Sequence, residues 1–353
     1  MSWHHIEGHD TMVERFRNAL ARGRLASTFL FVGPAGIGKR TFAMKLAQAL
    51  LCEQREAAQL DPCERCPACV QVAAGTHPDL ETVSKPADKS FIPLAAFIGD
   101  PEHRMQEGLC HRIGLKPFMG GRKIAIIDDA DYLNQEGANA LLKTLEEPPP
   151  RSVLILIGTS VDKQLPTIRS RAQIIRFQPL AEEIVAKLLV EREIAADPAE
   201  ARRLASYSGG SLEQAVELAD AALWSFRGDL LGSLARWPVE GYRTAQSVND
   251  FINEAGKDAA PRRARSRLLI GFGLDFFRAL VRRLHGHAAV EHAELAELVE
   301  QAIRNGWNES AAVAALERSL DALSHVDRNA NQATMVESWF DDLAALSAPL
   351  SRV

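Results

Sequence analysis

Hydrophobic residues in the first half of the chain gather in short runs that alternate with longer amphipathic stretches. The runs are short, apolar and rich in β-branched or aromatic residues, which predicts strands of a buried sheet. Four such runs are present: Thr28–Val32, Lys123–Ile127, Val153–Ile157 and Ile174–Phe177. Stretches with helical periodicity lie between them, for example Arg40–Leu51 and Glu136–Glu147. Strands that alternate with helices indicate parallel βαβ units, so we expect an α/β domain.

The strand signal disappears after Pro179. Three helical stretches follow, up to about Ala222, and predict a small helical unit. From about Phe226 the chain has long helical periodicity to its end, which predicts a further all-α domain. The expected domains are 1–178 (α/β), 179–224 (small helical unit) and 225–353 (all-α).

The composition is that of a globular protein. Of 353 residues, 46% are hydrophobic and 25% are charged, and the formal net charge is −5. The longest aliphatic run, Val153–Ile157, is far shorter than a membrane span. The N-terminal segment lacks the basic start and apolar stretch of a signal peptide, so we expect a cytoplasmic protein. Net acidity argues against nucleic-acid binding by bulk charge.

A glycine-rich loop follows the first predicted strand. The segment Gly33–Lys39 matches G-x-x-x-x-G-K, with Gly36 also in the loop and Gly38 before the lysine. Between a strand and a helix, such a loop directs backbone N–H groups at a polyphosphate, and Lys39 would reach the β- and γ-phosphates. The pattern predicts a phosphate-binding loop.

The rest of this nucleotide site departs from the expected pattern. Arg40 stands where a Ser or Thr hydroxyl would hold Mg²⁺, and a guanidinium would repel a cation. Asp128, at the end of a strand, suits a carboxylate that orients Mg²⁺, but Asp129 is one methylene shorter than the Glu that commonly positions the attacking water. The sequence thus argues against Mg²⁺-dependent ATP hydrolysis and leaves nucleotide binding open.

Four cysteines fall within eighteen residues just after the phosphate-loop helix: Cys52, Cys63, Cys66 and Cys69. Two x2 spacings in series let thiolates converge on one tetrahedral ion, and the fourth thiolate closes the site. The pattern predicts a structural Zn²⁺ site, because no coordination position is left open.

Taken together, these motifs resemble one family. The phosphate loop with its four-cysteine module, Thr76–Asp79, the acidic segment at Asp128 and Asn139–Pro148 (NALLKTLEEP) are similar to bacterial clamp-loader subunits of the AAA+ class, over residues 1 to about 220. The resemblance implies an AAA+ P-loop domain with a zinc module at 52–69. It makes the small helical unit a lid and the last domain a collar for oligomerisation.

The departures point to one branch of this family. Glu213 lies where the family's ATPase (gamma/tau) subunits have an Arg that touches the nucleotide. With Arg40 and Asp129, it makes the chain resemble the delta-prime branch, which does not hydrolyse ATP. The alternative is an active gamma/tau-type subunit in which Thr41 takes the metal.

The resemblance also implies a role in trans. Arg171, in Ser170-Arg171-Ala172, matches the family's arginine finger, which enters a neighbouring subunit's ATP site. Thr159 falls at the family's sensor position. The expected partners are gamma/tau and delta subunits in a heteropentamer, with the sliding clamp and primed DNA reached through the assembly. The chain would then belong to the DNA polymerase III holoenzyme, a DNA-directed DNA polymerase, without an ATPase of its own. Residues 84–112 match no motif and are expected to form a variable surface segment.

Overall fold

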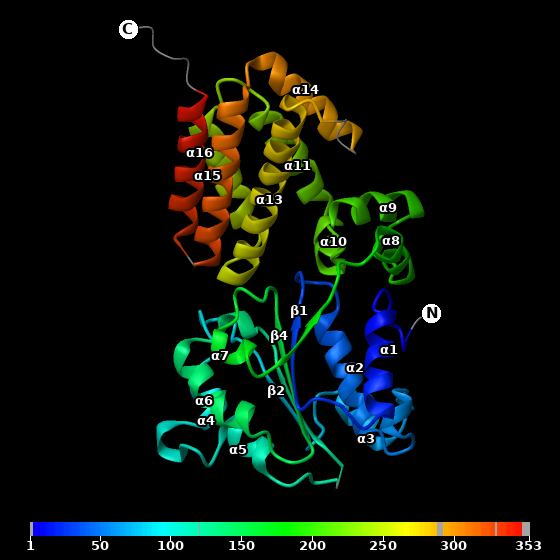
Figure 1. Ribbon diagram of the computed structural model, residues 1–353. Helices are drawn as coiled ribbons and strands as arrows, with labels where there is room; N and C mark the ends of the chain where they lie inside the picture. The colour runs from blue at the N-terminus through cyan, green and yellow to red at the C-terminus, as the bar shows by residue number, and fades with distance from the viewer. Residues whose placement is uncertain (1–2, 120, 288–291, 329, 348–353) are drawn as a thin grey trace. The chain divides into compact units, whose positions relative to one another are not determined.

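The computed structural model describes residues 3–119, 121–287, 292–328 and 330–347 (Figure 1). The chain divides into two compact units, Met1–Ala219 and Asp220–Val353. Among the described helices, none combines the length and apolar character that crossing a membrane requires.

The N-terminal unit is built on a parallel sheet in the order β2-β3-β4-β1-β5. The central strand β1 pairs with β4 and β5, so that Phe31 lies opposite Ile157 on one side and Ile175 on the other. The strands are β1 (Thr28–Val32), β2 (Leu80–Val83), β3 (Lys123–Ile127), β4 (Ser152–Gly158) and β5 (Gln173–Arg176).

Helices cover both faces of this sheet. Successive side chains of a strand point to opposite faces, so Phe31 packs into one hydrophobic cluster and Leu30 into the other. Helices α1 and α2 lie on the first face, and α4, α5 and α6 lie on the second (Figure 1). These helices are α1 (Asp10–Ala21), α2 (Lys39–Leu51), α4 (Ala95–Ile98), α5 (Gly108–Gly114) and α6 (Gln135–Glu146).

Shorter helices complete the N-terminal unit, and helices make up the C-terminal one. The first unit also contains α3 (Pro67–Ala73), α7 (Pro166–Arg169), α8 (Glu182–Glu191), α9 (Pro198–Tyr207) and α10 (Leu212–Leu218). The second contains α11 (Ala221–Leu234), α12 (Gly241–Asn253), α13 (Ala259–Leu284), α14 (Ala293–Asn305), α15 (Glu309–Asp327) and α16 (Gln332–Leu346). The expected α/β sheet and helical C-terminal region are confirmed.

The four strands expected from the sequence are present within two residues of their predicted ends, and β2 was missed. The surface-segment prediction for residues 84–112 holds only in part: residues 87–91 and 100–107 are exposed, whereas Phe97 and Leu109 are fully buried against the sheet. This segment is mostly irregular and its helices are short, so it has no periodicity to detect. The finer division at 178 and 224 stays a prediction, and residues 348–353 lie outside the described part.

An aromatic cluster fixes α2 on the sheet. Phe42, in the first turns of α2, is completely buried. The centroid of its ring lies 5.1 Å from that of Trp3, 5.9 Å from that of Phe31 and 5.2 Å from that of Phe177. Aromatic pairs at such separations add to the free energy of burial. The position of the phosphate loop, which precedes α2, depends on this packing.

We expect Phe42→Ala to lower the free energy of unfolding of the N-terminal unit by about 3–5 kcal/mol, because it leaves a cavity among aromatic rings. Phe118→Ala is the matched control, since Phe118 is 80% exposed, and should change the free energy by less than about 0.5 kcal/mol. Urea denaturation followed by circular dichroism measures both, and equal midpoints would contradict the prediction.

Candidate functional site

The phosphate loop lies at the carboxyl end of β1 and is closely approached by α10. Gly36 has a φ of +71°, and a Cβ at this position would lie 2.2 Å from the Oγ of Ser211 and 2.6 Å from the Cβ of Glu213. The N–H of Leu212 donates a hydrogen bond of 3.1 Å to the Gly36 carbonyl. Only glycine fits here, because the start of α10 fills the space beside the loop.

This contact places a negative charge against the loop. Ser211 caps α10 by accepting a hydrogen bond of 3.1 Å from the N–H of Gln214. Glu213 follows in the first turn of α10, and its side chain occupies the position beside Gly36 where a Cβ would lie. A carboxylate beside the loop repels the phosphates that such a loop would bind.

Lys39 is directed at the loop itself. Its ammonium donates to the carbonyl oxygens of Gly33, at 2.7 Å, and of Pro34, at 2.5 Å. The side chain is buried, and burial lowers the pKa of Lys39 below its usual value. The group that would reach a phosphate is therefore bonded to carbonyl oxygens of its own loop.

Arg40 and Asp128 form an ion pair across the site. The guanidinium Nη1 lies 3.1 Å from the Asp128 Oδ2. Asp128 directly follows β3 and Arg40 lies in the first turn of α2, so the paired charges come from two different segments. The carboxylate predicted to face Mg²⁺ thus faces a positive charge that the chain itself supplies.

The neighbouring carboxylate, that of Asp129, is hydrogen-bonded to the backbone of the segment that follows β2. Its Oδ2 accepts a hydrogen bond of 3.3 Å from the N–H of Lys85. Burial, and then the charge of Asp128, raise the pKa of Asp129. Part of the hydrogen-bonding capacity of this carboxylate is thus taken up by the chain's own backbone.

The hydroxyl at the expected sensor position is also bonded internally. Thr159 Oγ1 donates to Asp131 Oδ2 at 2.5 Å, and the Thr159 N–H bonds to the same carboxylate. Gln164 bonds to it as well. Asp131 thereby joins the segments that follow β3 and β4.

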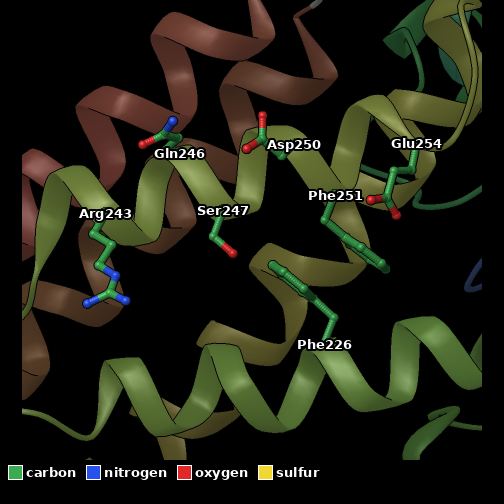
Figure 2. Close-up of a pocket in the computed structure, with 7 residues that line it drawn as sticks. All are labelled: Phe226, Arg243, Gln246, Ser247, Asp250, Phe251 and Glu254. Atoms are coloured by element: carbon green, nitrogen blue, oxygen red, sulfur yellow. The ribbon is translucent and has the colours of Figure 1, made fainter.

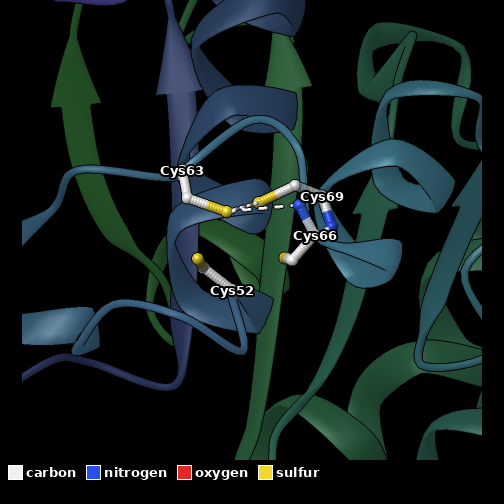
Figure 3. A group of neighbouring side chains, drawn as sticks. All are labelled: Cys52, Cys63, Cys66 and Cys69. Atoms are coloured by element: carbon white, nitrogen blue, oxygen red, sulfur yellow. Dashed lines mark hydrogen bonds between the residues drawn. The ribbon is translucent and has the colours of Figure 1, made fainter.

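The four predicted cysteines are brought together. Cys52 follows α2, Cys63 lies in the next loop, and Cys66 and Cys69 lie at the start of α3 (Figure 3). Their Sγ atoms all lie within 4.8 Å of one another. Thiolates around a tetrahedral Zn²⁺ lie about 3.8 Å apart, given Zn–S bonds of about 2.3 Å. The group is therefore able to hold a metal ion of this kind.

Hydrogen bonds from backbone N–H groups favour the thiolate form of two cysteines in this cluster. The N–H of Cys66 donates to Cys63 Sγ at 3.3 Å, and the N–H of Cys69 donates to Cys66 Sγ at 3.4 Å. Hydrogen bonds from backbone N–H groups, first that of Arg65, lower the pKa of Cys63 to about 6. Burial raises the pKa of Cys69. A metal ion would displace the proton that Cys69 retains.

The cysteine module is anchored to α2 and to the N-terminal segment. Gln48 of α2 donates to the Cys69 carbonyl at 2.9 Å, and Lys45 lies 2.6 Å from a carboxylate oxygen of Glu64. Trp3 donates through its indole nitrogen to the Leu60 carbonyl at 2.7 Å. The module is thus joined to the helix that begins at the phosphate loop.

Arg171 lies in the short connection between α7 and β5, outside the phosphate loop and the cysteine module. Its Nε and Nη2 donate to one carboxylate oxygen of Glu146, at 3.0 and 2.6 Å. Its Nη1 donates to the Thr167 carbonyl and to Ser170 Oγ, each at 3.0 Å. The guanidinium is held by three residues.

Sequence reasoning missed several contributors to these sites. The sequence places Glu146 in a family motif but assigns it no contact, and it gives no indication of a role for Gln164. His9, whose Nε2 lies 2.8 Å from the Ile37 carbonyl in the phosphate loop, was also missed. Each acts through a partner remote in sequence, so local spacing carries no signal for it.

The C-terminal unit has a hollow of its own, between α11 and α12. Figure 2 shows Phe226 and Phe251 face to face, and their ring centroids lie 4.2 Å apart. Arg243, Asp250 and Glu254 also line the cavity, whose volume is about 350 Å³. None of the residues predicted from the sequence as site residues lines it.

Comparison with known proteins agrees with the N-terminal motifs. Residues 8–181, about half of the chain, match the family described as "DNA polymerase III, delta subunit". The chain is 36% identical over 197 residues to DNA polymerase III subunit delta' of Pseudomonas aeruginosa, covering 54% of this chain and 55% of that protein. It is 34% identical to subunit delta' of Bacillus subtilis, over 57% and 56%.

Residues 8–181 of the chain belong to the DNA polymerase III clamp-loader family. Both branches of the family are similar to it: subunit gamma of Buchnera aphidicola is 30% identical over 222 residues, which cover 62% of this chain and 58% of that protein. The chain spans just over half the length of each of these relatives. The similarity therefore identifies the clamp-loader family but does not separate the delta' branch from the gamma/tau branch. The geometry of the nucleotide site is the evidence that distinguishes these two branches.

We expect the purified clamp-loader chain to contain one Zn²⁺, measured by atomic absorption. Cys69→Ser should remove the ion and lower the unfolding temperature, because Cys69 is buried in the cluster. Cys110→Ser is the matched control, since Cys110 lies outside the cluster, and should keep the metal. Full metal content in Cys69→Ser would contradict the assignment.

Proposed function

We propose that this chain is a non-hydrolysing delta-prime (stator) subunit of the DNA polymerase III clamp loader. The Arg40–Asp128 ion pair is the observation that carries the proposal. A catalytic Mg²⁺ bridges the β- and γ-phosphates and neutralises their charge in the transition state. Here the Arg40 guanidinium pairs with the carboxylate that would orient the ion, so Mg²⁺ would lose a ligand and meet a like charge.

Two further contacts support the proposal. Lys39 is bonded to carbonyl oxygens of its own loop, and Glu213 brings a negative charge to the same loop. Phosphate binding would have to break the lysine's bonds and overcome the repulsion. The contacts of Lys39 and Glu213 weaken phosphate binding, whereas the Arg40–Asp128 ion pair opposes Mg²⁺ binding. Both effects disfavour ATP hydrolysis.

The chain would act on ATP held by another subunit. In our proposal Arg171 enters the site of a neighbouring gamma/tau subunit and stabilises the charge on the γ-phosphoryl group. In other systems an arginine supplied in this way is worth about 10³–10⁵ in rate. The departures in the chain's own nucleotide site would not affect this role, because Arg171 precedes β5, whereas the phosphate loop follows β1, which pairs with β5 in parallel.

The remaining parts take structural roles in the same proposal. The four thiolates would hold a Zn²⁺ that fixes the loop after α2, and helices α8 to α10 would form the lid. The C-terminal helices would form the collar. The subunit would work in the cytoplasm, in a heteropentamer with gamma/tau and delta subunits that places the sliding clamp on primed DNA during replication.

We expect no steady-state ATP turnover by the purified, zinc-loaded chain with Mg²⁺. A coupled assay for ADP measures this, with Lys39→Ala as the background control. Turnover that Lys39→Ala abolishes would contradict the proposal and favour an active gamma/tau-type subunit. Thr41 would then be the first candidate for the metal ligand.

Arg171→Ala should remove the contribution of one ATP site from the turnover of a complex reconstituted with gamma/tau and delta subunits. Arg169→Ala is the matched control, since Arg169 is an exposed arginine two residues away, and should leave turnover unchanged. Equal rates for the two variants would overturn the role in trans.

We expect Arg40→Thr to give nucleotide binding that increases with Mg²⁺, because it frees Asp128 and restores a hydroxyl for the ion. Arg40→Lys is the matched control, because it keeps the positive charge. Titration of a fluorescent ATP analogue with and without Mg²⁺ measures the effect. Mg²⁺-dependent binding in the unmodified chain would show that the ion pair does not exclude the metal.

A further inference from the structure

We propose that Glu146 is a positioning residue for Arg171. Its carboxylate orients the guanidinium that reaches the neighbouring ATP, so this inference rests on the function proposed above. Glu146 ends α6 and Arg171 follows α7, so that the two side chains meet only through the fold.

The geometry accounts for most of the donors of the guanidinium. An arginine has five N–H groups in a rigid plane. Nε–H and one Nη2–H bond to Glu146, and Nη1 bonds to Thr167 and Ser170. Within the described part of the chain, these bonds leave one Nη2–H without a recorded partner. The side chain keeps 32% of its surface exposed, so this donor is available to an acceptor on another subunit.

The contact with Glu146 differs in kind from the other two. Thr167 and Ser170 lie within four residues of Arg171 and hold one end of the guanidinium locally. Glu146 is 25 residues away and takes two N–H groups on one oxygen, Oε1. It adds a long-range restraint at Nε and Nη2, on the side of the guanidinium that the two local contacts to Nη1 do not hold.

The place of Glu146 in its helix also favours a role beyond helix stability. A carboxylate in the last turn of a helix is disfavoured because it faces the negative end of the helix dipole. Glu146 stands at this unfavourable end of α6 and is compensated by Arg171. Glu147 is the next residue and is also acidic and exposed, but within the described part of the chain Arg171 pairs with Glu146 and not with Glu147.

Positioning has a large effect on the rate and a small effect on stability. The pair is partly exposed, with Glu146 49% exposed, and such pairs contribute little to the stability of the fold. An arginine finger, by contrast, acts only if its donor is already placed where charge develops, and a misplacement of about 1 Å can cost 10²-fold. Losing Glu146 should therefore reduce catalysis far more than folding.

The first test uses the isolated chain and needs no partner. Phenylglyoxal modifies accessible guanidinium groups, and peptide mapping gives the rate at Arg171. Glu146→Ala should increase this rate several-fold, whereas the matched control Glu147→Ala should leave it unchanged. Equal reactivity of Arg171 in both variants would overturn the positioning role, whatever the function of the arginine. Urea denaturation checks that the variants fold alike.

The second test uses the complex reconstituted with gamma/tau and delta subunits. Glu146→Ala should lower kcat at the site served by Arg171 about tenfold without changing the KM for ATP. Glu146→Gln should restore part of the rate, because its amide oxygen still accepts from Nε and Nη2. Combined with Arg171→Ala, Glu146→Ala should cause no further loss.

Other outcomes separate the two proposals. A higher rate in Glu146→Ala would show that the carboxylate restrains Arg171 and must release it, which contradicts positioning. An unchanged rate, or additive losses in the double variant, would do the same. If Arg171→Ala itself leaves turnover unchanged, the role in trans fails, and the phenylglyoxal result alone decides whether Glu146 orients the arginine.

Discussion

Packing of helix α2 against the sheet is the constraint on which the rest of the N-terminal unit depends. Phe42 holds the helix in place from within an aromatic cluster. The same helix begins at Lys39, presents Arg40 to Asp128 and is followed directly by Cys52. One buried interface therefore sets the position of the phosphate loop, of the ion pair and of the first thiolate.

The charged side chains at the nucleotide site interact with other groups of the same chain. Lys39 is bonded to loop carbonyls, Asp128 is paired with Arg40, and Glu213 approaches the loop from α10. Arg40 is 62% exposed, so its pair contributes little to stability. Its importance is local, because the positive charge lies where a divalent cation would have to bind.

Much of the fold was predictable because its signals are local. The strands at β1, β3 and β4 are uninterrupted apolar runs, since helices cover them on both faces. The four cysteines were predictable as a group because their spacing limits how thiolates can converge. Strand β2 was missed because its burial is partial, and Phe97 was missed because the chain around it has no regular period.

The sequence by itself determined the residue types of each site: the glycine-rich loop, the Arg at position 40, the four thiols and Arg171. Their bonding depended on the tertiary structure, because each partner lies on a segment remote in sequence. Arg40 meets Asp128 across 88 residues, and Arg171 meets Glu146 across 25. Such contacts depend on how strands and helices pack, and a hydrogen bond requires a geometry that spacing along the chain does not specify.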